Sequence, residues 1–255
     1  MALWLNSQNV ILLGTLATLG TGLAGGIGAL PVFLTSRIND KLLDTLLGFA
    51  AGVMLAATSF SLLVPAMELA SVWVVVFGVL LGAGFVALAD RLVPHIHFIS
   101  GPEGPKTTTL KRITLLILAI TIHNFPEGMA VGVAFGMGDI RAGTAVAIAI
   151  ALQNMPEGLA VALPLIREGY SRRKAVLFAL LSSAVEPIGG FLGAASVSIA
   201  RPLLPMGLAF AAGAMLYVVS EEMIPETHRK GFAKVGTIGL LAGFAVMMVL
   251  DNVFG

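Results

Sequence analysis

Two short stretches of the sequence place ionisable and amide side chains inside long apolar runs. The first is 123–128 (His-Asn-Phe-Pro-Glu-Gly), within the run 113–136, and the second is 153–158 (Gln-Asn-Met-Pro-Glu-Gly), within the run 142–166. Asn, Pro, Glu and Gly recur at matching positions of the two stretches. Ionisable side chains are costly in hydrocarbon, and those found within membrane segments are usually functional. We therefore expect the functional site to be built from both stretches.

The spacing within each stretch brings its polar groups together. Residues three or four positions apart lie on one face of an α-helix, so His123, Asn124 and Glu127 share a face. The matching set on the following helix is Gln153, Asn154 and Glu157. Imidazole nitrogens and carboxylate oxygens bind zinc and similar divalent ions. Two such faces turned toward each other predict a site for a divalent metal.

A third carboxylate occurs in another apolar run. Glu186 precedes Pro187 near the middle of the run 173–199. Taken alone, Glu186 is equally consistent with a hydrogen-bonded packing residue between helices. Together with the glutamates of the two stretches, it would give three mutually repelling carboxylates in a medium of low dielectric constant. A divalent cation among them would offset that repulsion.

The composition is typical of a membrane protein. Of the 255 residues, 57% are hydrophobic and only 11% are charged, against about 25% charged residues in soluble domains. A net charge of +1 argues against nucleic acid as a partner. Cysteine is absent, so there is neither a disulfide framework nor a thiolate metal site. No basic residue precedes the first apolar run, which argues against a cleaved secretory signal.

The number of membrane spans follows from the apolar runs, because a spanning helix needs about 20 apolar residues. Eight runs meet this requirement: 8–34, 44–67, 70–93, 113–136, 142–166, 173–199, 203–226 and 234–254. We therefore predict an all-α, polytopic membrane protein in which residues 1–255 form a single transmembrane domain.

The basic residues predict the orientation of the chain. The loops after the first, third, fifth and seventh runs hold 13 of the 15 lysines and arginines, and the opposite side holds Arg141 and Arg201. Cytoplasmic loops are enriched in basic residues. The loops rich in lysine and arginine are therefore predicted to be cytoplasmic, and with eight spans both termini are predicted to be extracytoplasmic.

A second repeat joins distant parts of the chain. Residues 49–55 read Phe-Ala-Ala-Gly-Val-Met-Leu, and residues 210–216 read Phe-Ala-Ala-Gly-Ala-Met-Leu. The predicted topology runs these two helices in opposite directions, as in transporters built from inverted repeats, whose sites lie near the membrane midplane. The alternative is chance similarity among helices rich in Ala, Gly and Leu. We favour duplication.

An enzyme is the less favoured interpretation of the polar stretches. Metalloproteases bind zinc through His-Glu-x-x-His, whereas here the order is His-Asn-Phe-Pro-Glu, with proline inside the motif and no second histidine one turn later. An intramembrane metallohydrolase and a metal-sensing receptor remain as alternatives. We expect a protein that is not an enzyme.

The two stretches, in the fourth and fifth predicted helices, resemble the signature of the ZIP (Zrt/Irt-like) divalent metal transporters, in particular the bacterial ZupT/GufA-like branch. The resemblance covers essentially the whole chain. It implies uptake of Zn²⁺ into the cytosol across the cytoplasmic (inner) membrane, with tolerance for Fe²⁺, Mn²⁺, Cd²⁺ or Ni²⁺. It implies a midplane metal site between helices four, five and six. The implied partners are divalent metal ions and the lipid bilayer, and a homodimer is left open.

The resemblance also implies which residues bind the metal, at two adjacent positions. The first position takes His123, Glu127, Gln153 and Glu157, with Glu186 bridging and the Met54 thioether nearby. The second position takes Asn124, Glu127, Asn154, Glu157 and Glu186. Some family members carry aspartate where Asn154 stands, so the second position has one carboxylate fewer in this chain. Taken alone, Met54 is typical of a core methionine.

Residues nearer the ends of the helices are implied to line the pathway. Ser61, Pro65 and Glu68 lie toward the outer end of the second predicted helix, and Asp90, Glu221, Glu222 and His228 lie toward the inner ends of the third and seventh. Ordinary interfacial charges are an equal alternative for Glu68, Asp90 and His228. His95 and His97, in the loop after the third run, are a weak signal for metal sensing, and we interpret them as ordinary loop residues.

The inverted repeat predicts how such a transporter would work. Alternating access, in which one group of helices rocks against another, is expected for this architecture. A channel built with the same ligands is the alternative.

Overall fold

The computed structural model of this chain describes residues 7–35, 38–97, 101–105, 112–228 and 231–254. Eight helical segments of the described chain are long and apolar enough to cross a membrane: Asn9–Phe33, Asp40–Leu69, Val72–Leu92, Ile117–Gly136, Ile140–Arg167, Arg172–Ile199, Arg201–His228 and Ala233–Phe254. They coincide with the eight predicted runs to within a few residues. The prediction of an all-helical membrane protein is thereby confirmed.

Five of the spans are essentially continuous. They are α1 (Ser7–Ala29, extended by the 3₁₀ turn η2, Leu30–Phe33), α4 (Val72–Leu92), α5 (Arg112–Gly136), α6 (Ile140–Arg167) and α11 (Ala233–Phe254). The strands of the described chain, β1 (His95–His97) and β2 (Gly101–Glu103), form a short antiparallel hairpin in the connection between α4 and α5. The hairpin packs against α5.

The other three spans are interrupted. The second span consists of α2 (Asp40–Ala56), the π-helical segment η3 (Ala57–Leu63) and α3 (Val64–Leu69). The sixth span consists of α7 (Arg172–Ser182), the 3₁₀ turn η4 (Ser183–Val185) and α8 (Glu186–Ile199). The seventh span consists of the 3₁₀ turn η5 (Arg201–Leu203), α9 (Leu204–Val218), the π-helical segment η6 (Val219–Met223) and α10 (Ile224–His228). Single π turns inside α-helices are uncommon and are frequent at functional sites.

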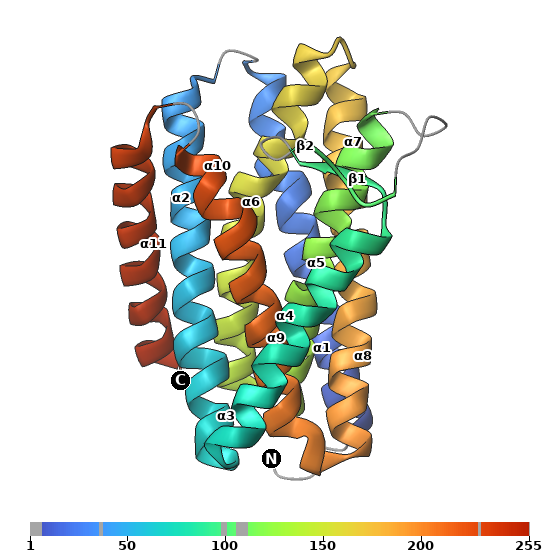
Figure 1. Cartoon of the computed structure of the whole chain (residues 1–255), viewed down its shortest axis with the longest axis vertical. Coiled ribbons are helices and arrows are strands. Elements are labelled where there is room, and N and C mark those ends of the chain that lie inside the picture. The colour runs from blue at the N-terminus through green and yellow to red at the C-terminus, as the bar shows by residue number, and fades with distance from the viewer. Residues whose placement is uncertain (1–6, 36–37, 98–100, 106–111, 229–230, 255) are drawn as a thin grey trace.

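The loops of the chain lie alternately at the two ends of the bundle, as predicted. Figure 1 shows that α1 begins and α11 ends toward one end of the bundle, whereas the connections after the first, third, fifth and seventh spans lie at the other end. Those connections carry most of the lysines and arginines. Which end faces the cytosol stays a prediction from the distribution of these basic residues.

The two copies of the Phe-Ala-Ala-Gly motif have similar local structure. Residues 49–55 lie in α2 and residues 210–216 lie in α9, and each copy is followed within a few residues by a π segment, η3 or η6. A proline follows each π segment, Pro65 after η3 and Pro225 after η6. Proline displaces the carbonyl four residues earlier, and a widened turn accommodates it. The two copies are therefore similar in local structure as well as in sequence.

The helix packing follows the same symmetry. The most extensive pairings are α2 with α11 and α9 with α4, and likewise α1 with α6 and α8 with α5. The repeat matches the first three spans, in order, with the last three, and it matches α5 with α6. Under this matching, the pair α2 and α11 corresponds to the pair α9 and α4, and the pair α1 and α6 corresponds to the pair α8 and α5. This correspondence supports the predicted inverted repeat.

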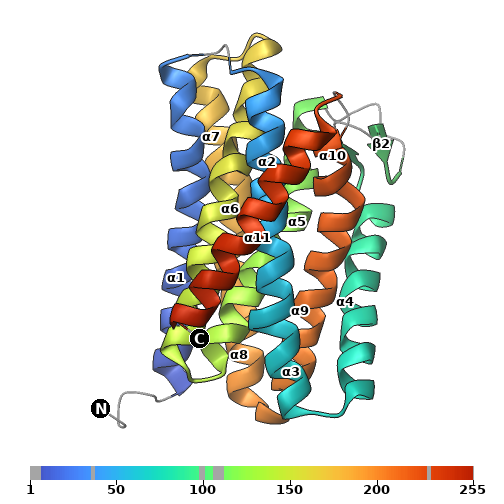
Figure 2. The ribbon, with the colours of Figure 1, turned by 90° about the vertical axis from the view of Figure 1, so that its left-hand side faces the viewer.

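These pairings divide the bundle into two groups of four spans. The first group comprises α1, α5, α6 and α7–α8, and the second comprises α2–α3, α4, α9–α10 and α11. In Figure 2, α4 and α9 stand together on one side, and α1, α6 and α7 stand together on the other. The two groups meet mainly where α2 packs on α6 and α5 packs on α9.

Glycine allows the helices of the first group to approach closely. A Cβ atom on Gly128 would collide with the backbone carbonyl of Glu186, and one on Gly158 would collide with the backbone carbonyl of Gly25. Small residues at such contacts are typical of membrane bundles, in which close packing replaces the hydrophobic effect between helices. The final glycine of each polar stretch therefore brings its helix against a neighbour of the same group.

Candidate metal site

The two polar stretches lie on neighbouring helices, as predicted. Residues 123–128 belong to α5 and residues 153–158 belong to α6, and the two helices pack against each other. Five of the six predicted polar side chains are buried, with no more than 7% of the residue exposed: His123, Asn124, Glu127, Gln153 and Asn154. Glu157 is partly buried, and its Oε1 atom is enclosed. The polar groups therefore face the interior of the bundle.

Glu186 joins them from the interrupted sixth span. The 3₁₀ turn η4 ends the first half of this span, and Glu186 is the first residue of α8, with Pro187 at the next position. Proline is favoured in the first turn of a helix, where an amide hydrogen has no helical partner. The residue is completely buried. The sequence thus starts a helix in mid-membrane and places a carboxylate at its beginning.

Each of the two adjacent amides on α6 donates to a glutamate. Nε2 of Gln153 donates to Oε1 of Glu127 over 2.7 Å, and Nδ2 of Asn154 donates to Oε1 of Glu186 over 2.8 Å. Nδ2 of Asn124, on α5, donates to Oγ of Ser183 over 3.2 Å. Each amide therefore directs its nitrogen toward a protein acceptor.

The same side chains leave several oxygens without a protein donor. Within the two polar stretches, one buried side-chain oxygen of each of the following residues has no hydrogen-bond partner in the described part of the chain: Asn124 (Oδ1), Glu127 (Oε2), Gln153 (Oε1), Asn154 (Oδ1) and Glu157 (Oε1). Buried polar atoms are nearly always hydrogen-bonded, so a group of unpaired oxygens needs an explanation. Amide and carboxylate oxygens are ligands of divalent cations. The site therefore has the donor atoms that a cation needs.

Glu127, Glu157 and Glu186 do not form a tight trio: no choice of one oxygen from each brings all three atoms within 4.8 Å of one another. All three side chains belong to the first helix group. The binding of a cation among the three glutamates therefore stays a prediction.

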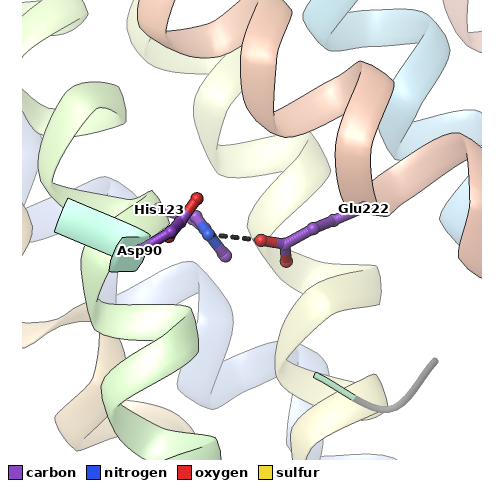
Figure 3. A group of neighbouring side chains, drawn as sticks. All are labelled: Asp90, His123 and Glu222. Atoms are coloured by element: carbon purple, nitrogen blue, oxygen red, sulfur yellow. Dashed lines mark ion pairs between the residues drawn. The ribbon is translucent and has the colours of Figure 1, made fainter. Parts of the chain in front are cut away.

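His123 points toward the second helix group. Its Nε2 atom lies 2.6 Å from Oε1 of Glu222, in η6, and Figure 3 shows the two side chains meeting beside Asp90, at the end of α4. One ligand atom from each of the three residues lies within 4.8 Å of the others, and no other such trio of His, Asp or Glu occurs in the described residues. The structure thus pairs His123 with Glu222 and Asp90, whereas the sequence assigned it to the metal position of Glu127 and Glu157.

The hairpin extends this cluster. His95 is buried, with its Nε2 atom 3.5 Å from Oδ1 of Asp90 and its Nδ1 atom 2.7 Å from the carbonyl oxygen of Val93. His95 therefore lies at the cluster rather than in solvent, unlike the ordinary loop residue that we expected. The side chain of His97 lies outside the described residues.

The predicted pathway residues occupy different environments. Ser61, in η3, donates to Oδ1 of Asp251 over 2.6 Å, which links the second and eighth spans. Glu68 and Glu221 are exposed. His228 is exposed as well, and its Nδ1 atom contacts the carbonyl oxygen of Ile224 in its own helix. Glu222 alone, of the adjacent pair Glu221 and Glu222, belongs to the cluster with His123, and the pathway roles of all these residues stay predictions.

Met54 is fully buried in the apolar core, in the same cluster as Met215, which holds the equivalent position of the repeat. The structure therefore gives Met54 a packing role. Its predicted place near the metal stays a prediction.

Three of the residues found here were not singled out from the sequence. Thr21 donates to Glu186, Ser183 accepts from Asn124, and Asp251 accepts from Ser61. Asp251 carried a signal, a carboxylate within an apolar run, that we did not use. Threonine and serine are common in membrane helices and bond to their own backbone, so Thr21 and Ser183 gave no signal.

Comparisons with known proteins agree with the resemblance seen in the motifs. The family model described as ZIP zinc transporter matches residues 103–251. The zinc transporter GufA of Myxococcus xanthus is 45% identical over 251 residues, which cover 95% of this chain and 99% of that protein. The zinc transporter ZIPB of Bordetella bronchiseptica is 42% identical over 248 residues (91% and 78%). The zinc transporter ZupT of Corynebacterium glutamicum is 38% identical over 257 residues (91% and 95%).

Proposed function

Because the chain belongs to the ZIP family of zinc transporters, we propose that it carries Zn²⁺ across the cytoplasmic membrane into the cytosol. Zinc is the metal in the names of the relatives GufA, ZIPB and ZupT. Proteins of this kind transport metal and do not catalyse a reaction on it. The loops rich in lysine and arginine then face the cytosol, as the positive-inside rule requires.

The five unpaired, buried oxygens of α5 and α6 carry the proposal. A buried polar atom without a hydrogen-bond partner destabilises the fold, and a buried carboxylate without a partner destabilises it more. A divalent cation between Glu127 and Glu157 supplies the missing partner, and the amide oxygens of Gln153 and Asn154 complete its surroundings. The cation is the substrate of transport, so these contacts must form and break in each cycle.

The two helix groups suggest a carrier. Glu127, Glu157 and Glu186 all belong to the first group, whereas Asp90 and Glu222 belong to the second. Movement of one group against the other would open the site to either side in turn, the alternating access expected of inverted repeats. A channel with the same ligands would need no such movement, so the kinetics of flux separate the two mechanisms.

The positions of the carboxylates suggest a route. The metal reaches the bundle at its outer end, where Ser61 and Asp251 are hydrogen-bonded. It binds at the glutamates in mid-membrane. Glu222 contacts His123, which lies one turn from Glu127 on α5, so a cation can pass from the glutamates to Glu222 before it leaves beside Asp90.

Uptake into sealed liposomes tests the function. The purified protein should accumulate ⁶⁵Zn²⁺ with saturable, slow kinetics; an ohmic metal current would favour a channel. A hydrolase or a receptor would accumulate no metal at all. Competition by Fe²⁺, Mn²⁺, Cd²⁺ and Ni²⁺ in the same assay defines the metal preference.

One substitution tests the site itself. Glu157→Ala should abolish ⁶⁵Zn²⁺ uptake while membrane insertion and monodispersity in detergent remain normal. Glu168→Gln is the matched control, because Glu168 is an exposed glutamate that directly follows the last residue of the same helix, and it should transport normally. Near-normal uptake by Glu157→Ala would refute the proposed site.

A further inference from the structure

Glu186 differs from the other two glutamates because protein donors occupy both of its oxygens. Oγ1 of Thr21, on α1, donates to Oε2 over 2.5 Å, and Nδ2 of Asn154 donates to Oε1 over 2.8 Å. By contrast, Glu127 and Glu157 each keep an oxygen without a partner in the described chain. Glu186 therefore has its hydrogen bonds satisfied by protein alone.

The orientation of Asn154 follows from its surroundings. Its Nδ2 atom lies 2.9 Å from the carbonyl oxygen of Thr21 as well as 2.8 Å from Oε1 of Glu186. The carbonyl oxygen of Thr21 can only accept a hydrogen bond, so the Asn154 atom that faces it must be the donating nitrogen. Turning the amide over would place its oxygen against two other oxygens. Asn154 thus directs a donor, rather than a ligand atom, at Glu186.

The contact of Thr21 with Glu186 is the shorter of the two that its hydroxyl makes, at 2.5 Å. The Thr21 hydroxyl also lies 3.1 Å from the carbonyl oxygen of Thr18 in its own helix, and it has only one proton. The shorter contact, to Glu186, is therefore the one that this proton makes.

We propose that Thr21 and Asn154 are positioning residues that occupy both carboxyl oxygens of Glu186, so that the transport site accepts one divalent cation rather than two. This inference rests on the proposed function of the same site. A second cation bound at Glu186 would have to displace the hydroxyl proton of Thr21. It would also face the amide NH₂ group of Asn154, whose hydrogens carry partial positive charge and repel a cation. The single cation lies between Glu127 and Glu157, whose two negative charges it balances.

Metal stoichiometry tests this inference. Purified protein is dialysed to equilibrium against Zn²⁺, and the bound metal per chain is measured by mass spectrometry. The double variant Glu127→Gln, Glu157→Gln gives the metal bound elsewhere. Subtraction should leave about one ion for the unmodified chain and about two for Asn154→Asp, since aspartate replaces the donor by a carboxylate. Two ions in the unmodified chain, or one in Asn154→Asp, would overturn the inference.

Isosteric substitutions test the part played by Thr21. Thr21→Val removes the hydroxyl that occupies Oε2 of Glu186 and should raise the bound Zn²⁺ above one ion per chain, whereas Thr21→Ser keeps a hydroxyl and should hold the number at about one. Thr18→Val is the control, because the buried hydroxyl of Thr18 donates only to carbonyl oxygens of its own helix. Equal numbers of bound ions in Thr21→Val and Thr18→Val, or more than one bound ion in Thr21→Ser, would contradict the positioning role.

Uptake distinguishes the two proposals. Liposomes that accumulate no ⁶⁵Zn²⁺ with the unmodified chain would refute the transport function, whatever the stoichiometry. Normal uptake together with two bound ions would refute the one-cation inference alone.

Discussion

The Nε2 atom of His123 lies 2.6 Å from Oε1 of Glu222, and this contact joins the two helix groups. His123 belongs to α5 of the first group, next to the amide and carboxylate ligands, and Glu222 belongs to the π-helical segment η6 of the second. Both side chains are largely buried, at 8% and 19% exposed. Any displacement of one group against the other must break or remake this contact.

Glu222→Gln should slow transport more than it weakens binding. Glutamine keeps the size of the side chain but loses the charge that holds His123 and attracts a departing cation. A hydrogen bond to a charged group contributes about 1.5–3 kcal/mol, so we expect the maximal rate of ⁶⁵Zn²⁺ uptake to fall about tenfold or more. The KM for zinc should change little, because Glu222 lies beyond the three-glutamate site.

Glu221→Gln is the matched control for this prediction. Glu221 is the preceding residue of the same π segment and is exposed, so its substitution should leave the rate of uptake unchanged. Equal losses of rate in the two variants would show that the charge of this helix end matters, rather than the contact with His123.

Much of the fold could be predicted because membrane spans are encoded locally. Each of the eight runs is long enough by itself to cross the bilayer, and the placement of lysine and arginine in alternate loops needs no knowledge of packing. The grouping of Asn124 with Glu127, and of Gln153 with Glu157, also follows from helical spacing alone.

The partners of these side chains could not be predicted, because they come from distant spans. His123 and Glu222 are about 100 residues apart in the chain, and Thr21 and Glu186 lie on α1 and α8. Helical spacing gives the face of a helix but not the helix that it meets. For this reason His123 was assigned to the glutamates on its own face, although the structure directs its Nε2 atom to Glu222.

Met54→Leu tests whether a thioether contacts the metal. Leucine has a similar volume, so the packing cost should be under about 1.5 kcal/mol. If sulfur is a ligand, uptake of the soft ion Cd²⁺ should weaken roughly tenfold, and more than uptake of Mn²⁺, which prefers oxygen. Met215→Leu, at the equivalent buried position of the repeat, should leave the ratio of Cd²⁺ to Mn²⁺ uptake unchanged. Identical ratios in both variants would leave Met54 with a packing role alone.

Uptake should fall as the solution is acidified. The carboxylates and the imidazole of the site bind a cation only when deprotonated, so protons compete with the metal. Between pH 8 and pH 5, with equal pH on both sides of the liposome membrane, the KM for zinc should rise while the rate at saturating zinc changes less. A flat profile over this range would contradict the coupling between protonation and binding.

Gly158→Ala should strongly destabilise the first helix group. A Cβ atom at this position collides with the backbone carbonyl of Gly25, and because a backbone cannot rotate away, α1 and α6 must separate. Overpacking typically costs 1–3 kcal/mol, and we expect a loss toward the upper end of about 3 kcal/mol, measured as a lower midpoint of thermal unfolding in detergent. Gly20→Ala is the control, because a Cβ atom there meets no neighbour within 4 Å. Alanine is the better helix former, so Gly20→Ala should unfold at the same temperature or slightly higher. Equal midpoints for Gly158→Ala and the unmodified chain would contradict the close approach of α1 and α6.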